Sequence, residues 1–245
     1  RYAAQAWAGD VVSDWDVLRN QIPAALNVSL TGIPYWNSDI GGFFSGRKFP
    51  EGVKDPAFHE LYVRWMQFAA FTGMMRSHGT NTPREIFMFG ERGYWAFDAQ
   101  EKMINLRYRL LPYIYSTSWE VTSNGGSLMR ALFSDFPEDK KVTDIGDEYM
   151  FGKSILVAPV ISEVKRRSLY LPEGTQWIDF WTGEKQKGGQ EISREAPIDI
   201  IPLYVKAGSI IPAGPSVQFA TEKSWDDLQA VSYTHLRAHE TVLDL

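Results

Sequence analysis

Cysteine is absent from this 245-residue sequence, which excludes disulfide bonds, thiolate metal sites and a cysteine nucleophile but leaves the cellular compartment open. No apolar run approaches the roughly 20 residues that a bilayer-spanning helix needs. Charges of both signs are interspersed and sum to −5, so the sequence predicts neither a nucleic-acid partner nor a membrane partner. The chain begins with neither methionine nor a signal peptide, and we expect it to be a fragment.

Three apolar, aromatic-rich runs each end in a polar side chain that lies next to glycine. The polar residues are Asp10 (in YAAQAWAGD), Asp39 (in GIPYWNSD) and His78 (in TGMMRSH). Buried strands that end in polar residues and alternate with helices are typical of a (β/α) barrel, which places its functional groups at the C-terminal rim. The pattern therefore predicts that the three side chains converge on one pocket.

Apolar residues at helical spacing predict three helices in the first half of the chain. The first covers residues 13–30, with Pro23 as a kink or break, and the second runs from 55 to 71. The third covers roughly residues 94–121, and Pro112 should bend it late in its course.

The pattern changes near Asn124, where two glycines follow. Beyond it come short apolar or alternating runs separated by turn residues, at 154–162, 167–172, 176–181, 196–205 and 208–214. Such spacing predicts a small antiparallel β-sandwich. The predicted fold class is therefore α/β, with part of a (β/α)8 TIM barrel at residues 1–124 and a β-sandwich at 125–229.

The last segment, residues 230–245, continues no strand pattern and is expected to be unrelated to the fold. It resembles translated adapter sequence at the end of a gene fragment. His235 and His239 lie four residues apart and could share a helix face as metal ligands, but no third ligand is nearby, so we predict no metal site there.

Each polar residue at the predicted rim also has a simpler structural explanation. Asp10 could cap a helix, Asp39 could hold a Gly-rich turn, and His78 could be a satisfied histidine at a strand end. Three such residues at three consecutive strand ends are harder to explain by turns, because a barrel directs all of them to one spot.

Aromatic residues surround the same positions. Sugar rings present apolar faces that stack on aromatic side chains, so Trp7, Trp36 and Phe43 are candidates for the walls of a sugar pocket. Two carboxylates and a histidine within such walls suit carbohydrate chemistry. We predict an oligosaccharide substrate and no cofactor.

Six ordered motifs in residues 2–229 resemble glycoside hydrolase family 31, the retaining α-glucosidase and α-xylosidase family. The motifs are RYAAQAWAGDVVSDW, LTGIPYWNSDIGGFF, RWMQFAAFTGMMRSHG, LRYRLLPYIYS, GKSILVAPV and YLPEGTQWIDFWTGE. The resemblance implies that Asp10 is the general acid/base and that Asp39 and His78 hydrogen-bond the sugar in the −1 subsite. It also implies that Phe43 and Trp36 wall this subsite, with Trp7 close to the acid.

One departure from the family pattern matters for activity. The family's nucleophilic aspartate lies in a W-x-D-x-N-E type motif on an earlier strand, and this sequence contains no such motif. Arg1 is too close to Asp10 to be the family's subsite arginine. We therefore expect the chain by itself to be inactive, since losing a nucleophile removes nearly all turnover.

The motifs GIPYWNSDIGGFF and RSHGTNTPRE together resemble the α-xylosidase branch of the family, which implies an α-xyloside substrate of the xyloglucan type. Trp36 could fill the space that the hydroxymethyl group of glucose needs. α-Glucosidase and α-galactosidase activities stay open. A carbohydrate-binding module with Trp177 and Trp181 on one exposed face is a second possibility. A metal-dependent hydrolase is a third, and it would need one further ligand beside the three polar residues. The sequence does not determine the oligomeric state.

Overall fold

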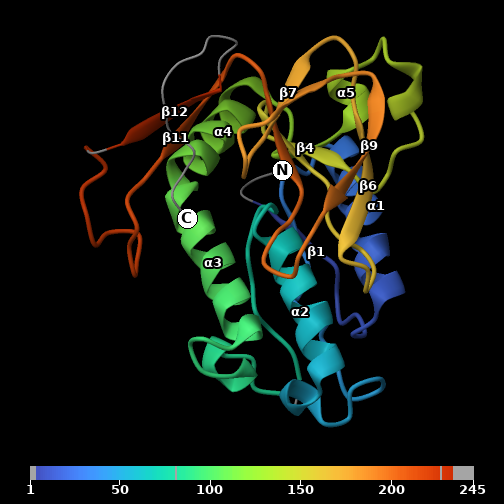
Figure 1. Cartoon of the computed structure of the whole chain (residues 1–245), viewed down its shortest axis with the longest axis vertical. Helices are drawn as coiled ribbons and strands as arrows, with labels where there is room; N and C mark the ends of the chain where they lie inside the picture. Colours follow the sequence, from blue (N-terminus) through green and yellow to red (C-terminus); the bar gives the residue numbers. More distant parts are fainter. Residues whose placement is uncertain (1–3, 81, 227, 234–245) are drawn as a thin grey trace.

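The computed structural model describes residues 4–80, 82–226 and 228–233. The amino-terminal part supplies helices and two short strands, and the carboxyl-terminal part supplies a β domain that covers one end of the helices (Figure 1). The first part contains β1 (Ala6–Trp7), α1 (Trp15–Leu30), β2 (Trp36–Asn37), α2 (Pro56–Ala69), α3 (Trp95–Arg109) and α4 (Leu111–Asn124), with the 3-10 helices η1 (Gly52–Lys54) and η2 (Ile86–Phe89).

The β domain begins with β3 (Met129–Ala131), α5 (Leu132–Asp135) and the 3-10 helix η3 (Lys140–Val142). Its remaining strands are β4 (Tyr149–Phe151), β5 (Ile155–Val157), β6 (Arg166–Leu171), β7 (Gln176–Asp179), β8 (Lys185–Lys187), β9 (Gln190–Glu195), β10 (Leu203–Lys206), β11 (Ser209–Ala213) and β12 (Gln229–Tyr233). No described helix is long and apolar enough to cross a bilayer.

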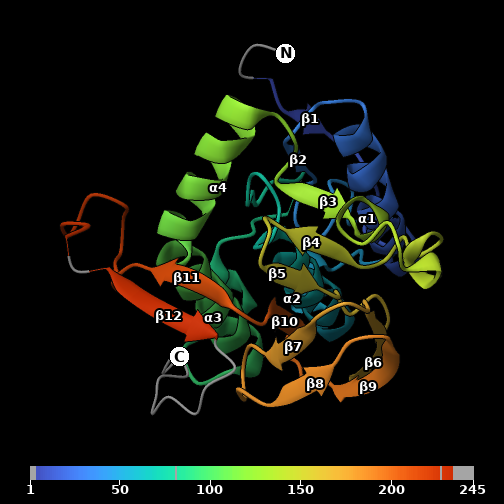
Figure 2. The ribbon, with the colours of Figure 1, turned by 90° about the horizontal axis from the view of Figure 1, so that it is seen from above.

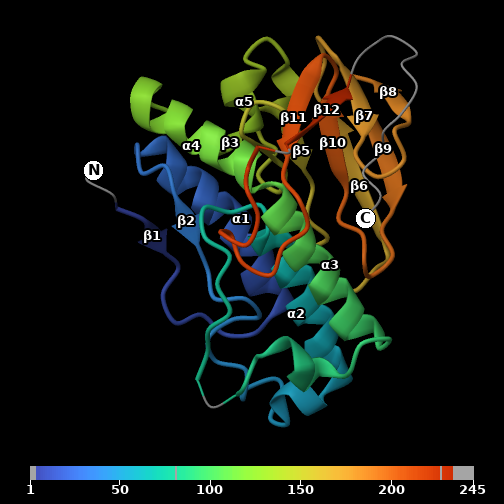
Figure 3. The same cartoon turned by 90° about the vertical axis from the view of Figure 1, so that its left-hand side faces the viewer.

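The first two predicted strands form and pair in parallel, as a (β/α) barrel requires. Ala6 lies opposite Trp36 and Trp7 opposite Asn37. The helices α1, α2 and α3 lie between this strand pair and the β domain (Figure 3). Almost every residue of α2 is buried, which identifies it as the central helix of the core.

The third predicted strand, residues 72–78, does not form a strand in the structure. The backbone N–H of Ile40 donates to the carbonyl oxygen of Arg76, so the segment still lies beside the chain that follows β2. However, Arg107 donates to the carbonyl oxygens of Ala70, Thr72 and Gly73. A side chain therefore occupies acceptors that a β-ladder would use.

The two prolines flagged in the sequence behave differently. Pro23 lies inside α1, which continues unbroken to Leu30, so the predicted break is wrong. The predicted helix at 94–121 forms as two helices, because α3 ends at Arg109 and α4 begins at Leu111, close to the bend predicted at Pro112. Pro112 stands in the first turn of α4, where its missing N–H costs no helical hydrogen bond.

The β domain contains a six-stranded antiparallel sheet in the order β3-β4-β5-β10-β7-β8. Tyr149 and Val157 of this sheet pack into the core that contains α2 and α3. Met150 and Leu156, on the opposite face, pack into a second core together with Leu169 of β6. Both faces are buried, which explains why β4 and β5 are apolar throughout rather than alternating.

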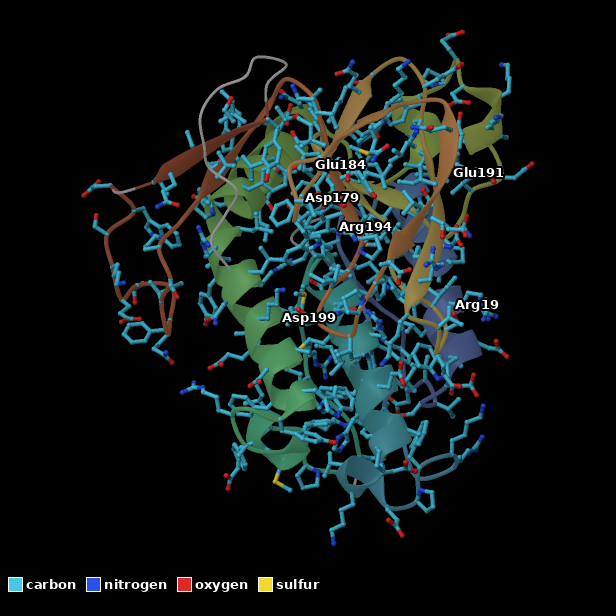
Figure 4. The ribbon with its side chains drawn as sticks, in the orientation of Figure 1. Arg19, Asp179, Glu184, Glu191, Arg194 and Asp199 are labelled. Atoms are coloured by element: carbon cyan, nitrogen blue, oxygen red, sulfur yellow. The ribbon has the colours of Figure 1, made fainter. Side chains whose placement is uncertain are left out.

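The antiparallel pair of β6 and β9 forms the outer layer over this sheet (Figure 2). An ion pair joins the layers, since Nε of Arg194 on β9 lies 2.7 Å from Oδ2 of Asp179 on β7 (Figure 4). The structure is therefore a partial TIM barrel followed by an antiparallel β domain with two layers.

A buried arginine fastens the β domain to the barrel part. Arg64 of α2 donates to the carbonyl oxygens of Ala196, Pro197 and Ile200 at 2.6, 3.3 and 2.9 Å. Its neighbour Gln67 donates to the carbonyl oxygen of Ile198. Because these acceptors lie in the loop between β9 and β10, a single helix turn holds the second domain in place.

The predicted end of the β domain at residue 229 is wrong. Residues 230–233 belong to β12, which pairs antiparallel with β11, and Val231 and Tyr233 are buried. The strand alternates buried and exposed residues over only five positions, which is too short to stand out in a polar segment. His235 and His239 lie outside the described residues.

Candidate active site

The rim of the strand pair is formed by the residues that follow β1 and β2. The two strands are parallel, and the backbone N–H of Ala8 extends the ladder by donating to Asn37 O at 3.0 Å. Asp10 comes three residues after Trp7, and Asp39 comes two residues after Asn37. Both carboxylates therefore follow the carboxyl ends of neighbouring strands, at one edge of the sheet.

Asp39 is the most deeply buried of the predicted site residues, at 0% exposure. Its Oδ1 accepts a hydrogen bond from Nε1 of Trp7 at 3.2 Å and lies 3.6 Å from a guanidinium nitrogen of Arg76. Its Oδ2 is buried and has no hydrogen-bond partner among the described residues. Asp39 therefore has one acceptor oxygen that no described donor satisfies.

Burial raises the pKa of Asp39 above its ordinary value. The positive charge of Arg76 opposes this most strongly, and His78, the Trp7 hydrogen bond and Arg84 oppose it less. The Arg76 guanidinium also lies 5.4 Å from the centroid of the Trp7 ring, so one cation contacts both the carboxylate and the indole.

The Gly-rich turn after Asp39 lies against the chain that follows Asp10. The Val11 carbonyl accepts from Phe44 N at 3.0 Å, and the Phe44 carbonyl accepts from Ser13 N at 2.9 Å. Gly42 has a φ of +79°, and a Cβ there would lie 2.7 Å from the backbone of Val12. Only glycine allows this approach, which places the Asp10 loop beside the turn.

Phe43 and His78 lie together at the same rim. Their ring centroids are 5.3 Å apart, and Phe43 O accepts from Thr80 N at 3.1 Å. His78 is exposed, as is Asp10, which accepts no side-chain hydrogen bond from the described residues. Trp7 is 44% exposed. The site is thus an open surface with Asp39 at its base.

Trp36 does not join this group. Gln5 and Trp7 hydrogen-bond the side chains of Asn37 and Asp39, which identifies the inner face of the strands. Consecutive strand residues point to opposite faces, so Trp36 points outward and packs into the core, where it is 8% exposed.

Two arginines near the site were not identified from the sequence. Arg76 precedes His78 by two residues in an extended run, and period-two alternation could have placed both on the inner face. Arg84 lies in a loop, and nothing in the local sequence predicts that it folds back beneath the site. Arginine on its own is most often a surface residue.

The structure bears on the two alternative functions, a carbohydrate-binding module and a metal-dependent hydrolase. Trp177 is fully buried in the second core, and Trp181 donates to the carbonyl oxygen of Ile201 beneath Lys102, so the two rings form no exposed sugar-binding face. Among the described residues, no three His, Asp or Glu side chains are grouped as metal ligands.

Comparison with known proteins identifies the family. Residues 1–117 match the glycosyl hydrolases family 31 TIM-barrel domain, and residues 125–211 match the glycosyl hydrolase family 31 C-terminal domain. The chain belongs to glycoside hydrolase family 31. The relatives that it resembles include an α-xylosidase and an α-glucosidase.

Two curated relatives are similar over most of this chain. An α-xylosidase from Saccharolobus solfataricus is 46% identical over 92% of this chain and 30% of its own length. The α-glucosidase 2 of Bacillus thermoamyloliquefaciens is 35% identical over 91% of this chain and 27% of its own length. The chain thus spans about three tenths of the relatives that it matches.

Solved structures agree with these relatives. The family 31 α-xylosidase of Xanthomonas citri is 42% identical with a TM-score of 0.89, covering 95% of this chain and 26% of that one. An α-xylosidase from a soil metagenome, solved in complex with xylose, is 38% identical with a TM-score of 0.77 and covers 84% of this chain and 32% of that one.

Proposed function

We propose that this chain carries the general acid/base and part of the sugar-binding site of a retaining, exo-acting α-glycosidase. The observation that carries the proposal is the Asp39 carboxylate, buried at the base of an open aromatic site with one oxygen unpartnered among the described residues. Burying an unpartnered carboxylate oxygen is costly unless a ligand completes it. Sugar hydroxyl groups are suitable donors.

The proposed chemistry divides between Asp10 and a nucleophile that this sequence lacks. Asp10 gives its proton to the glycosidic oxygen as the bond to the anomeric carbon breaks, while the second carboxylate attacks that carbon from the opposite face. Asp10, now ionised, then takes a proton from water, and the resulting hydroxide releases the sugar from the covalent intermediate. Exposure of Asp10 at the rim suits a group that must meet both leaving group and water.

In the same proposal the remaining rim residues bind the sugar in the −1 subsite. Asp39 and His78 hydrogen-bond its hydroxyl groups, and Phe43 and Trp7 contact its apolar faces. The 5.3 Å separation of the Phe43 and His78 rings and the Trp7–Asp39 hydrogen bond support a single continuous subsite. Arg76 joins this set because it contacts both Asp39 and Trp7.

Terminal α-xylose of xyloglucan-type oligosaccharides is the substrate that we propose. Support comes from the α-xylosidases at 46% and 42% identity. Trp36 no longer supports it, because its side chain packs into the core on the outer face of the strands. An α-glucosidase is the second candidate, and the 35% identical relative favours it.

A chimera tests the proposal. In the Xanthomonas citri α-xylosidase, the region aligned with this chain is replaced by this chain, so that the host supplies the rest of the barrel. We expect hydrolysis of aryl α-xylosides with retention of configuration, and a kcat/KM for α-xylosides above that for α-glucosides. A chimera that prefers α-glucosides would favour the second candidate, and a folded but inactive chimera would contradict the proposal.

A further inference from the structure

Arg84 lies beneath the turn that connects Asp39 to Phe43. Its guanidinium donates to the carbonyl oxygens of Ile40, Gly42 and Phe43 at 2.8, 2.5 and 3.1 Å. The side chain is buried, and its cation lies 5.7 Å from the centroid of the Phe58 ring. Arg84 therefore holds two of the three carbonyls between Asp39 and Phe43, as well as that of Phe43 itself.

These acceptors have few other ways to be satisfied. The turn is buried, and two successive glycines, Gly41 and Gly42, give it a left-handed backbone that no regular ladder can pair. Buried carbonyl groups without a donor are costly. The planar fork of an arginine can reach three of them at once, whereas the ammonium group of a lysine is a single point.

The surrounding loop is shaped to admit this guanidinium. A Cβ at Gly79 would lie 2.1 Å from Cζ of Arg84, so only glycine leaves room for it. The carbonyl oxygen of Arg84 is near the hydroxyl of Tyr62, which also bonds Ser77 at 2.8 Å. The loop that starts at His78 is thus closed back onto the Asp39 turn.

We propose that Arg84 is a positioning residue for the −1 subsite, fixing the turn from Asp39 to Phe43 against the loop of His78. The inference rests on the proposed function for its catalytic consequence. Arg84 does not touch the sugar in this scheme. It acts through the backbone that carries Asp39 and Phe43, and Gly79 is the residue that makes its position possible.

Arg107 provides a matched control. It is a half-buried arginine and also donates to three carbonyl oxygens, those of Ala70, Thr72 and Gly73. These acceptors follow α2 and lie outside the turn from Asp39 to Phe43. Arg107→Gln should lower global stability much as Arg84→Gln does, without a selective effect on that turn.

The first experiment is hydrogen exchange, read by mass spectrometry, on the 245-residue chain and on the chimera. In Arg84→Gln, amides of residues 40–45 should exchange about tenfold faster or more, because local opening then needs less free energy. Gly79→Ala should give the same local result, and Arg84→Lys should restore protection only in part. Arg107→Gln should leave residues 40–45 unchanged relative to the rest of the chain.

The second experiment measures kinetics in the chimera, below the melting temperature of every variant. Arg84→Gln and Gly79→Ala should lose about tenfold or more in kcat/KM for aryl α-xylosides, as expected when binding groups are misplaced. Arg107→Gln should retain the kcat/KM of the parent chimera. Equal effects of the Arg84 and Arg107 variants in both experiments would overturn the proposal. An inactive parent chimera would contradict the proposed function instead, while hydrogen exchange would still test Arg84.

Discussion

At the scale of single residues, the site depends on how charges are placed around Asp39. The carboxylate is buried, yet Arg76 and His78 supply enough positive charge to oppose part of the rise in its pKa. Asp10 has no such surroundings among the described residues and is exposed. In the proposed function the buried carboxylate binds the sugar and the exposed one transfers the proton.

Replacing Asp10 by asparagine tests its role as the acid. In the chimera, Asp10→Asn should lower turnover of substrates with poor leaving groups by about 100-fold or more, because their glycosidic oxygen needs protonation. Activated aryl α-xylosides need little acid assistance, so their glycosylation step should suffer less. Steady-state and pre-steady-state kinetics on a leaving-group series measure the overall turnover and the rate of the glycosylation step. Equal losses across the series would show that Asp10 is not the acid.

Glu148 makes a separate prediction for stability. Burial raises the pKa of this carboxyl from 4.5 to about 8, although Tyr170 N donates to it and Arg167 lies 4.0 Å away. Between these two pH values the folded chain keeps a proton that the unfolded chain releases, so rising pH favours unfolding. Stability from the protonated group is complete below pH 4.5 and is lost as the pH rises through about 8.

The Glu148→Gln variant isolates this effect. Glutamine keeps an acceptor for Tyr170 N and cannot ionise. The apparent Tm of the variant should therefore fall less than that of the parent as the pH rises from 5 to 8. Between pH 5 and 8 the parent should lose on the order of a few kcal/mol more of its free energy of unfolding than the variant does. Thermal unfolding at several pH values measures it, with exposed Glu51→Gln as the control. Parallel pH profiles of parent and Glu148→Gln would refute the prediction.

At the scale of elements, arginine side chains donate hydrogen bonds to backbone carbonyls that regular backbone pairing usually satisfies. Arg64 and Arg84 are buried and Arg107 is half-buried, and each donates to three backbone carbonyls of a different segment. They hold the β9–β10 loop, the Asp39 turn and the end of α2 respectively. The two domains are therefore joined by specific hydrogen bonds as well as by the shared apolar core.

Arg64→Met should show how much the hydrogen bonds between the two domains contribute to the free energy of unfolding. The substitution keeps most of the apolar stem but leaves the carbonyls of Ala196, Pro197 and Ile200 without their donor, which should cost about 3 kcal/mol or more. Urea unfolding of the parent chimera and the variant measures the change. Arg19→Ala is the control, because its pair with Asp16 is exposed and should contribute about 0.5 kcal/mol. Similar losses in both variants would contradict a special role for Arg64.

The sequence predicted elements well where one physical rule decides them. The doubly buried strand β5 lies in the predicted apolar run at 154–162, and Asp55 with Pro56 marks the start of α2, whereas β4 was not predicted. The strand predicted at residues 72–78 does not form, because Arg107, distant in sequence, donates to carbonyl oxygens that a ladder would use. Local patterns do not report a competitor for hydrogen bonds that comes from another element.

The candidate site divides in the same way. Asp39 follows β2 as the strand-end pattern predicts, whereas His78 lies beside Phe43 although its segment forms no strand. Trp36 lies in the core and not at the rim, because period-two alternation directs it away from the face that carries Asn37 and Asp39. Arg84 could not be predicted, since its position depends on the three-dimensional closure of the loop after His78.

At the scale of the whole molecule, the chain spans only part of the length of the α-xylosidases that it resembles. It spans 26–32% of the two solved α-xylosidases described above. Within the described residues, β1 pairs with β2 alone, so its other edge carries unpaired backbone groups. Trp7, Met74 and Phe87 are exposed apolar side chains of the barrel part. Open strand edges and apolar surfaces favour self-association.

The chain by itself should therefore be inactive and prone to associate. With Asp10 present but the nucleophile motif absent, no covalent intermediate can form, and aryl α-xylosides and α-glucosides should show neither a burst nor steady turnover. Light scattering after size-exclusion chromatography should report concentration-dependent species larger than 27.9 kDa. In the chimera the host strands cover the β1 edge, so the same residues should give a defined species with activity. Turnover by the purified chain would show that its own side chains supply a nucleophile, and a stable monomer at high concentration would show that the open edge is protected.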